Sequence, residues 1–251
     1  MSGNPNRAKR IADIHMHIVP DVDDGSGSMK ESMLLLRLAV EQGVGTIIAT
    51  PHSWAIDECG MDHALTRFRK LQKAAGEFRI PVELYPGCEM LVFPGTVDLC
   101  IDKLDDGRYP TLAGSRYVLT EFMPTVSQDD MELCIEKIAA ARYIPVIAHA
   151  ERYENSTADG IRTLKKLGAM VQINAYSIAN EQNKRIRDLA NALLSERLAD
   201  FIGSDAHRLN HRPPIIAQGI ATLKEQYPEN YVKRVVSQNA DELLITRSEK
   251  N

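Results

Sequence analysis

The feature that most limits how this chain can fold is a series of six apolar runs, the first of which contains two histidines, while the five later ones end in histidine or an acidic residue. The first run, Ile11 to Val19, contains His15 and His17 two residues apart. Alternate residues of a β-strand face the same side, so in a strand both imidazole rings could share a metal ion. The later runs end at His52, Glu89, Glu121, His149 and the pair Asp205 and His207. We therefore expect the six ends to meet at one place.

Short apolar segments alternate with amphipathic ones along the rest of the chain. The pattern predicts seven strands, at 11–19, 45–50, 81–88, 117–122, 144–148, 170–174 and 200–204. It predicts helices at 28–42, 62–78, 97–104, 129–142, 159–167, 183–198, 214–226 and 231–244. Ser28 followed by Glu31 is a capping box that opens the first helix. The segments 51–60 and 91–96 are less regular.

Strands separated by helices predict a parallel sheet in an α/β fold, and no Gly/Ser-rich or Pro-rich linker divides the chain. We favour a single-domain (β/α)7 barrel over an open sheet. The carboxyl ends of the strands form a ring in a barrel, whereas an open sheet would spread them along a line. The domain is expected over residues 11–251, after a flexible segment at 1–10.

Composition narrows the class of protein. With 251 residues and a net charge of -4, the chain has no basic excess, which disfavours nucleic acid as a partner. No apolar run approaches the length of a membrane span, and the first ten residues lack the apolar core of a secretory signal. We therefore predict a cytoplasmic protein without membrane insertion. The four cysteines are scattered, are expected to be reduced, and none has arginine six residues on.

Five of the seven histidines lie at expected strand ends beside carboxylates. Residues at the carboxyl ends of barrel strands are typically catalytic. Imidazole and carboxylate together suit Mn, Fe, Co or Zn, and the lack of cysteine ligands argues against a purely structural zinc site. Asp13 is expected to orient a histidine or to cap the backbone. Trp54 could contact an aromatic substrate or shield a metal, and Tyr153 could line the site or pack beneath it.

Taken in order, the motifs resemble those of the polymerase and histidinol phosphatase (PHP) superfamily. They are Asp-x-His-x-His from residue 13, Val-Pro-Asp-Val-Asp-Asp-Gly-Ser from 19, Thr-Pro-His at 50–52, Gly-Cys-Glu at 87–89, Thr-Glu-Phe at 120–122, Ala-His-Ala-Glu-Arg-Tyr at 148–153, Gly-Ser-Asp-Ala-His at 203–207 and Arg-Pro-Pro at 212–214. The resemblance runs from Ile14 to Leu244. It is nearest to the bacterial manganese-dependent protein-tyrosine phosphatases of capsule and exopolysaccharide operons.

This resemblance implies a distorted (β/α)7 barrel with three divalent metal ions, Mn in the first place and Fe, Co or Zn as alternatives. The first ion would be held by His15, His17, Glu89 and Asp205. The second would share Glu89 and add Glu121 and His149, and the third would take Asp24, His52 and His207. Asp24 is preferred to Asp23 because it precedes Gly25.

Charge arithmetic fits a phosphate substrate. The four ligand carboxylates carry four negative charges and three divalent ions carry six positive ones, so about two positive charges remain, which match a phosphate monoester dianion. The resemblance implies that Arg152 and Arg212 bind the phosphate. The alternative is that both arginines form salt bridges at the rim. The implied reaction is attack of a metal-bound hydroxide on phosphorus, without a cysteine nucleophile.

The implied substrate is a phosphotyrosine protein, in particular a bacterial tyrosine kinase that controls capsule or exopolysaccharide synthesis. The segments 151–153 and 212–214 favour this branch of the superfamily. Histidinol phosphate, a sugar phosphate or a nucleotide are alternative substrates for the same metals. A nuclease or a metal-stabilised adaptor without hydrolysis are the remaining alternatives. The sequence does not indicate the oligomeric state.

Overall fold

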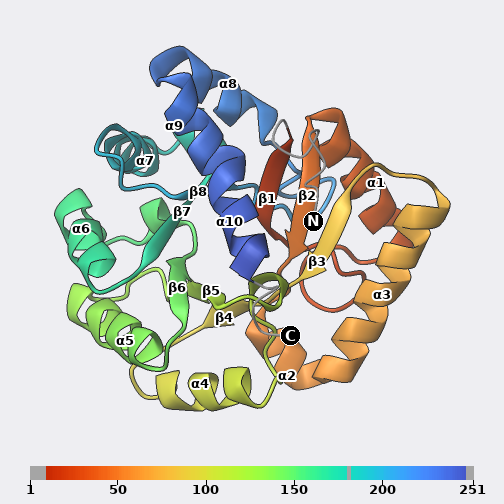
Figure 1. Cartoon of the computed structure of the whole chain (residues 1–251), viewed down its shortest axis with the longest axis horizontal. Coiled ribbons are helices and arrows are strands. Elements are labelled where there is room, and N and C mark those ends of the chain that lie inside the picture. Colours follow the sequence, from red (N-terminus) through yellow and green to blue (C-terminus); the bar gives the residue numbers. More distant parts are fainter. Residues whose placement is uncertain (1–9, 180–181, 247–251) are drawn as a thin grey trace.

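The computed structural model describes residues 10–179 and 182–246. Its strands lie in the middle of the molecule, with helices around them (Figure 1). The strands are β1 (Ile11–Met16), β2 (Val44–Ala49), β3 (Glu83–Pro86), β4 (Glu89–Leu91), β5 (Tyr117–Glu121), β6 (Ile144–Ile147), β7 (Met170–Asn174) and β8 (Phe201–Gly203). The α-helices are α1 (Met29–Glu41), α2 (Ser53–Cys59), α3 (Met61–Glu77), α4 (Val97–Asp105), α5 (Gln128–Ala140), α6 (Ala158–Lys166), α7 (Lys184–Ser195), α8 (Ala217–Gln226), α9 (Glu229–Lys233) and α10 (Asn239–Thr246).

The strands form two parallel sheets, in the orders β1-β2-β3 and β4-β5-β6-β7-β8. Two isolated parallel bridges join the sheets. One pairs Met16 at the end of β1 with Ala206 after β8, and the other pairs His52 after β2 with Glu89, the first residue of β4. Parallel strands point their carboxyl ends the same way, so the chain segments that follow them reach one face of the molecule.

The expected strand at 81–88 is divided in the structure, so the described residues contain eight strands rather than seven. Pairing with β2 stops at Pro86, which has no backbone N–H to continue the ladder. Glu89 then donates its backbone N–H to the carbonyl of Pro51 at 3.0 Å, and β4 pairs with β5. Glu89 was expected at the end of a strand and instead begins one.

The helices agree with the sequence pattern except in two places. The irregular segment before Gly60 contains the short helix α2, which buries Ala55 and Ile56. The expected helix at 231–244 consists of α9, a wide π turn at η5 (Arg234–Gln238) and α10. Directly after this turn, Asn239 donates from Nδ2 to the carbonyl of Asp200 at 2.7 Å. The side chain of Asn239 is buried, and this hydrogen bond ties α10 to the start of β8.

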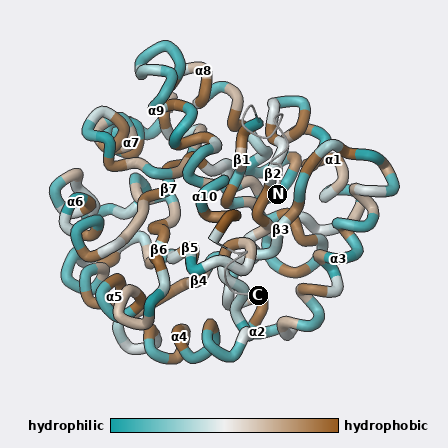
Figure 2. The backbone as a smooth tube through the Cα atoms, in the orientation of Figure 1, coloured by the Kyte–Doolittle hydropathy of each residue, from teal (hydrophilic) through white to brown (hydrophobic). Residues whose placement is uncertain are grey.

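Two apolar clusters form the core. The larger one lies between the strands and the surrounding helices, and Figure 2 shows hydrophobic residues in the strands and along parts of the helices. The smaller one takes residues from both sheets, among them Ile14, Ile48 and Phe201. Leu243 and Leu244 of α10 complete it, and Figure 1 shows α10 crossing the central strands. Because both sheets share this cluster, the described residues form a single α/β domain.

Two of the expectations concern the first residues of the chain and the absence of a membrane span. Residues 1–9 of the expected flexible segment lie outside the described residues. Among the residues that are described, no helix has both the length and the apolar composition needed to cross a bilayer.

Candidate metal centre

The residues expected to bind metal come together at one place, most of them at or just after the carboxyl ends of strands and Glu89 at the start of β4. His15 Nε2 lies 3.2 Å from Glu89 Oε1. The other oxygen of Glu89 lies 3.1 Å from His52 Nδ1, and this nitrogen is 3.4 Å from a carboxylate oxygen of Glu121. His149 Nε2 lies 3.0 Å from Glu89 Oε1. Glu89 is therefore at the middle of the cluster.

Four groups of these side chains place ligand atoms within 4.8 Å of one another, a spacing that could hold a metal ion. The groups are His15, His17 and Asp205; His15, Glu89 and His149; His52, Glu89 and Glu121; and His17, Asp24, His52 and His207. All nine residues expected as ligands occur in these groups. Glu89 occurs in two of them, as expected of a bridging carboxylate.

Hydrogen bonds fix which ring nitrogens face the cluster. His15 Nδ1 lies 3.0 Å from Oε1 of Gln172, and His17 Nδ1 lies 2.7 Å from a carboxylate oxygen of Asp23. Both partners are acceptors, so each Nδ1 keeps its proton when the ring is neutral, and each Nε2 is the nitrogen left to bind a metal ion once its own proton is lost. The two Nε2 atoms are 3.1 Å apart. Ligands on one metal ion with bonds of about 2.1 Å are spaced by about this distance.

His207 is oriented in the same way. Its Nδ1 donates to the backbone carbonyl of Asp205 at 2.9 Å, while its buried Nε2 has no hydrogen-bond partner and lies 3.6 Å from Asp24 Oδ1. Burial, with positive charge on His17, lowers the pKa of His207 to about 2, so this ring is neutral. Buried lone pairs that face carboxylates need a cation between them, so these residues fit divalent metal ions.

In the absence of metal, the pKa values of His52, His17 and Glu89 are shifted from their ordinary values. Burial by itself lowers the pKa of His52, but the adjacent carboxylates of Glu121 and Glu89 outweigh it and raise the pKa to about 9. Burial also opposes the charge on His17, yet Asp23 and Glu89 hold its pKa well above the ordinary value. Burial would raise the pKa of Glu89, but His15 and neighbouring rings keep it well below its usual range. A metal ion that binds here must therefore displace protons.

Asp23 and Asp24 have different surroundings. Burial disfavours charge on Asp23, but the bond to His17 and a hydrogen bond from the Gly25 N–H lower its pKa to about 2. Asp23 also accepts the backbone N–H of His52 at 3.1 Å. Asp24, which is half exposed, points to His52 and His207 at 3.5 and 3.6 Å. Asp23 therefore orients the ring of His17, whereas Asp24 has the geometry expected of a metal ligand.

Sequence reasoning missed a pair of buried amides on β7. Besides the contact to His15, Gln172 Oε1 accepts the backbone N–H of His149 at 2.8 Å. Its Nε2 donates to Asn174 Oδ1 at 2.8 Å, and Asn174 Nδ2 donates to Asp205 Oδ2 at 3.1 Å. One chain of amides thus orients three candidate ligands. Polar residues at alternate positions of an apolar strand were the available signal.

Asp13 caps the backbone, as expected. Its Oδ1 accepts the N–H of Ser204 at 2.9 Å and that of His15 at 3.3 Å, which ties the start of the first strand to the end of β8.

Both arginines lie at the cluster and both contact Asp205. Arg152 Nη1 is 2.8 Å and Arg212 Nη1 is 3.1 Å from the same oxygen, Asp205 Oδ2. About a third of each side chain is exposed, so each guanidinium can also meet a ligand from solvent. Asp205, Arg212 and His149 have φ of 53°, 56° and 32°. Such left-handed backbone in non-glycine residues is costly and concentrates at functional sites.

The two aromatic residues singled out in the sequence differ in exposure. Tyr153 is buried, its hydroxyl accepts the Phe122 N–H at 3.1 Å, and its ring packs against His149, so its role is packing. Trp54 stacks on His52 with ring centroids 5.6 Å apart and an interplanar angle of 25°, while 41% of its surface is exposed. The four cysteines are free.

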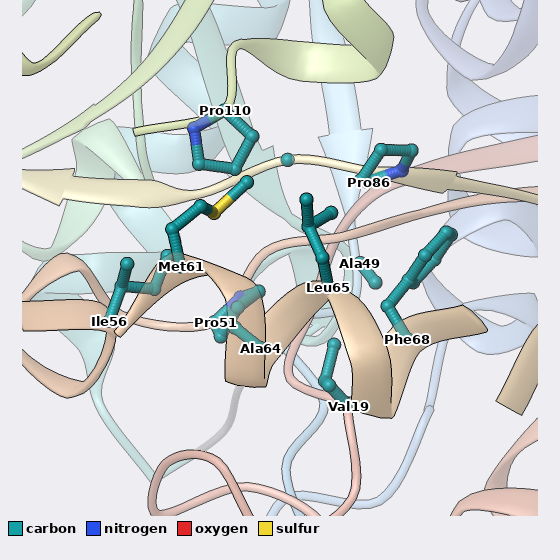
Figure 3. Close-up of a pocket in the computed structure, with 11 residues that line it drawn as sticks. Val19, Ala49, Pro51, Ile56, Met61, Ala64, Leu65, Phe68, Pro86 and Pro110 are labelled. Carbon is teal, nitrogen blue, oxygen red and sulfur yellow. The ribbon is translucent and has the colours of Figure 1, made fainter. Parts of the chain in front are cut away.

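A small apolar pocket lies beneath α2 and α3 rather than at the cluster (Figure 3). Ile56, Met61 and Phe68 face Pro86 and Pro110 across it, and all of its lining side chains are apolar. The pocket has no group that would bind a charged ligand. It shows how α2, which begins directly after His52, is packed onto the rest of the domain.

The fold and the cluster define a parallel α/β protein with several histidine and carboxylate groups that could hold metal ions. The model of the family described as capsular polysaccharide synthesis, CpsB/CapC, matches residues 11–245. The chain belongs to this family.

Similar proteins support the assignment over nearly the whole chain. The tyrosine-protein phosphatase CpsB of Streptococcus pneumoniae is 31% identical over 243 residues, which cover 94% of this chain and 98% of that protein. The tyrosine-protein phosphatase YwqE of Bacillus subtilis (strain 168) is 30% identical over 242 residues, with 93% and 91% covered. A solved structure described as one of the metal-dependent tyrosine phosphatases YwqE and CpsB superposes with a TM-score of 0.79, at 29% identity, and covers 94% of this chain and 95% of that chain.

A more distant likeness shows the fold alone. The phosphotriesterase homology protein of Escherichia coli, solved with phosphate in its active site, superposes with a TM-score of 0.59 at 14% identity.

Proposed function

We propose that this protein is a metal-dependent protein-tyrosine phosphatase. The observation that carries the proposal is the cluster of nine histidine and carboxylate side chains with Glu89 in its middle, together with two arginines at its edge. Membership of the family and the names of its relatives support the choice of phosphotyrosine as substrate.

In this proposal, three divalent ions occupy the cluster, and Mn is the first candidate. His15, His17, Glu89 and Asp205 hold one ion, Glu89, Glu121 and His149 hold the second, and Asp24, His52 and His207 hold the third. Bound divalent ions supply an activated water as nucleophile near neutral pH and offset the charge of an incoming phosphate. Gln172 and Asp23 keep the lone pairs of two histidines directed at the ions.

Arg152 and Arg212 bind the phosphate group in this proposal. Both guanidinium groups now contact one oxygen of Asp205 and retain donors that point elsewhere. A phosphoryl group beside them would receive planar, charge-assisted hydrogen bonds. These bonds would orient the phosphorus atom and stabilise charge on its oxygens as the transition state forms.

Asp23 adds to the negative charge of the centre, which the charge count from the sequence did not include. It is ionised and buried against His17, so it adds a fifth negative charge to the centre. Three divalent ions then leave about one surplus positive charge, and the two arginines raise this to about three. A phosphate monoester dianion remains well matched to the site.

We also propose how the two sheets are joined, which protein is the substrate and where the enzyme acts. The two sheets would act as one distorted (β/α)7 barrel if β3 and β4 count as a single broken strand, and the two bridges and the shared apolar cluster support this. The substrate would be a phosphotyrosine protein such as the bacterial tyrosine kinase of a capsule or exopolysaccharide operon, and the enzyme would act in the cytoplasm.

The test is phosphate release by Mn-loaded protein from a phosphotyrosine peptide, the matching phosphoserine peptide and histidinol phosphate. We expect the phosphotyrosine peptide to be hydrolysed with the highest kcat/KM. We also expect His149→Ala to lose activity, and Arg152→Ala or Arg212→Ala to lose about 100-fold or more in kcat/KM. Arg162→Ala is the matched control, because Arg162 pairs with Asp159 and Glu196 on exposed helices. Preference for histidinol phosphate would contradict the proposal.

A further inference from the structure

Exposed apolar side chains lie next to the candidate metal centre. Trp54, Phe93 and Met123 expose 41%, 39% and 47% of their surface. Each lies two to four residues after a proposed metal ligand, in the segments that follow β2, β4 and β5. We call these three side chains the apolar arc.

Hydrogen bonds hold the three segments of the arc beside one another. The hydroxyl of Ser53, next to Trp54, accepts the N–H of Leu91 at 3.1 Å. The residue after Leu91 donates its N–H to the carbonyl of Glu121 at 3.0 Å. The three segments that carry the arc are therefore held side by side by these two hydrogen bonds.

The arc is uncharged and is held in place. Residues 92–96 and 122–126 contain no charged side chain, and Pro94 and Pro124 directly follow two of the arc residues. Proline restricts the backbone of both segments. Trp54 rests on the ring of His52, and the apolar packing under α2 and α3 fixes the helix that carries it (Figure 3). An apolar ligand could thus bind without first ordering the surface.

The arc and the arginines belong to different strands around the centre. Arg152 follows β6 and Arg212 follows β8, whereas the arc follows β2, β4 and β5. A phosphate held by the arginines would therefore leave the arc free for other parts of the same substrate. A small phosphate ester has no group to cover three separate apolar side chains, but a polypeptide has.

We infer that the apolar arc binds apolar side chains that flank phosphotyrosine in a polypeptide substrate, an inference that rests on the proposed function. A second copy of this chain fits the arc less well. A stable dimer buries about 800 Å² per partner, more than three half-exposed side chains provide. It would also sit directly beside the centre that must admit substrate.

The test uses the Mn-loaded full chain and two phosphotyrosine peptides that differ only in their flanking residues, one with leucine and valine and one with serine and aspartate. Para-nitrophenyl phosphate, which has no flanking residues, is the third substrate. For the wild type we expect kcat/KM to be about tenfold higher for the apolar peptide than for the polar one, mainly through KM.

The variant Phe93→Ser/Met123→Ser should lose this preference. We expect the ratio of kcat/KM for the apolar peptide to that for para-nitrophenyl phosphate to fall about tenfold. The control variant Leu99→Ser/Leu133→Ser removes two equally exposed apolar side chains from α4 and α5 and should keep the wild-type ratio. Melting temperatures of both variants verify that they fold.

Equal kcat/KM of the wild type for the two peptides, or a wild-type ratio in the arc variant, would overturn the inference and leave the proposed function intact. A change in sedimentation of the arc variant with no change in flank preference would assign the arc to self-association instead. Failure of the wild type to hydrolyse any phosphotyrosine peptide would overturn the proposed function and the inference together.

Discussion

At the scale of single residues, hydrogen bonds to the ring Nδ1 atoms orient three of the candidate histidine ligands. Gln172 fixes the proton of His15 on Nδ1, Asp23 does the same for His17, and the backbone of Asp205 does so for His207. Each Nε2 then faces the carboxylates and is the nitrogen available to a metal ion. The ring tautomer thus depends on partners that do not touch the metal themselves.

Replacing Gln172 tests this dependence. Gln172→Leu keeps a side chain of similar size but removes the acceptor for His15, so the ring can turn or carry its proton on Nε2. We expect Mn affinity, measured by competition with a chelator, to weaken about 10- to 100-fold. Gln128→Leu is the control, since Gln128 bonds to Glu132 and to the Gly160 carbonyl on the helical shell. Equal affinity in the two variants would rule out the orienting role.

At the scale of secondary-structure elements, the segment after β1 brings both aspartates to the centre through a tight turn. Ser26 donates its N–H to the carbonyl of His17 at 3.0 Å, and Asp21 donates to the carbonyl of Ser26 at 2.8 Å. A Cβ atom on Gly25 would lie 2.2 Å from the carbonyl oxygen and 2.5 Å from Cβ of His17. Only glycine fits at this position, where the turn passes directly against His17.

The variant Gly25→Ala should therefore distort the turn and destabilise the protein. We expect a loss of about 1–3 kcal/mol in the free energy of unfolding by urea, together with weaker metal binding. Gly76→Ala is the matched change, because Gly76 lies in α3 with open space around its Cβ position. That substitution should stabilise by up to about 1 kcal/mol. Similar effects at the two glycines would show that the close approach to His17 is not limiting.

Most helices and strands could be predicted from the sequence, because hydrophobic periodicity and helix capping depend on residues that are close together in the chain. Ser28 accepts the N–H of Glu31 as the capping box predicts, and β7 has its expected bounds. The division of the third strand depends on the bond from Glu89 to the carbonyl of Pro51 as well as on Pro86, and the wide turn at η5 lies next to the bond from Asn239 to Asp200. Local pattern does not show such tertiary bonds, so it could not locate either feature. For the same reason Gln172 and the bond between Asp23 and His17 were not predicted, although the nine clustered residues were.

At the scale of the whole molecule, the two sheets bring ionisable side chains from distant segments close together. Their proximity decides which of them are protonated in the metal-free protein. Burial opposes charge on His52, but Glu121 and Glu89 raise its pKa to about 9, above the unfolded value of about 6.5. A raised folded pKa stabilises the fold fully below pH 6.5, and this contribution is lost as pH rises through 9.

We therefore expect the melting temperature of chelator-treated protein to fall between pH 7 and pH 9.5. Metal ions displace the same protons, so the increase in melting temperature on adding Mn should grow over this range. Thermal unfolding at several pH values, with chelator or with Mn, measures both trends. A metal-free protein that becomes more stable toward pH 9.5 would contradict this proton balance.

We propose above all that the side chains gathered around Glu89 form one centre for divalent metal ions. The most direct measurement is anomalous diffraction from a crystal grown with Mn. We expect up to three anomalous peaks around Glu89, each within about 2.5 Å of the ligand atoms of its group of side chains. Occupied Mn sites elsewhere in the crystal, with none around Glu89, would contradict it.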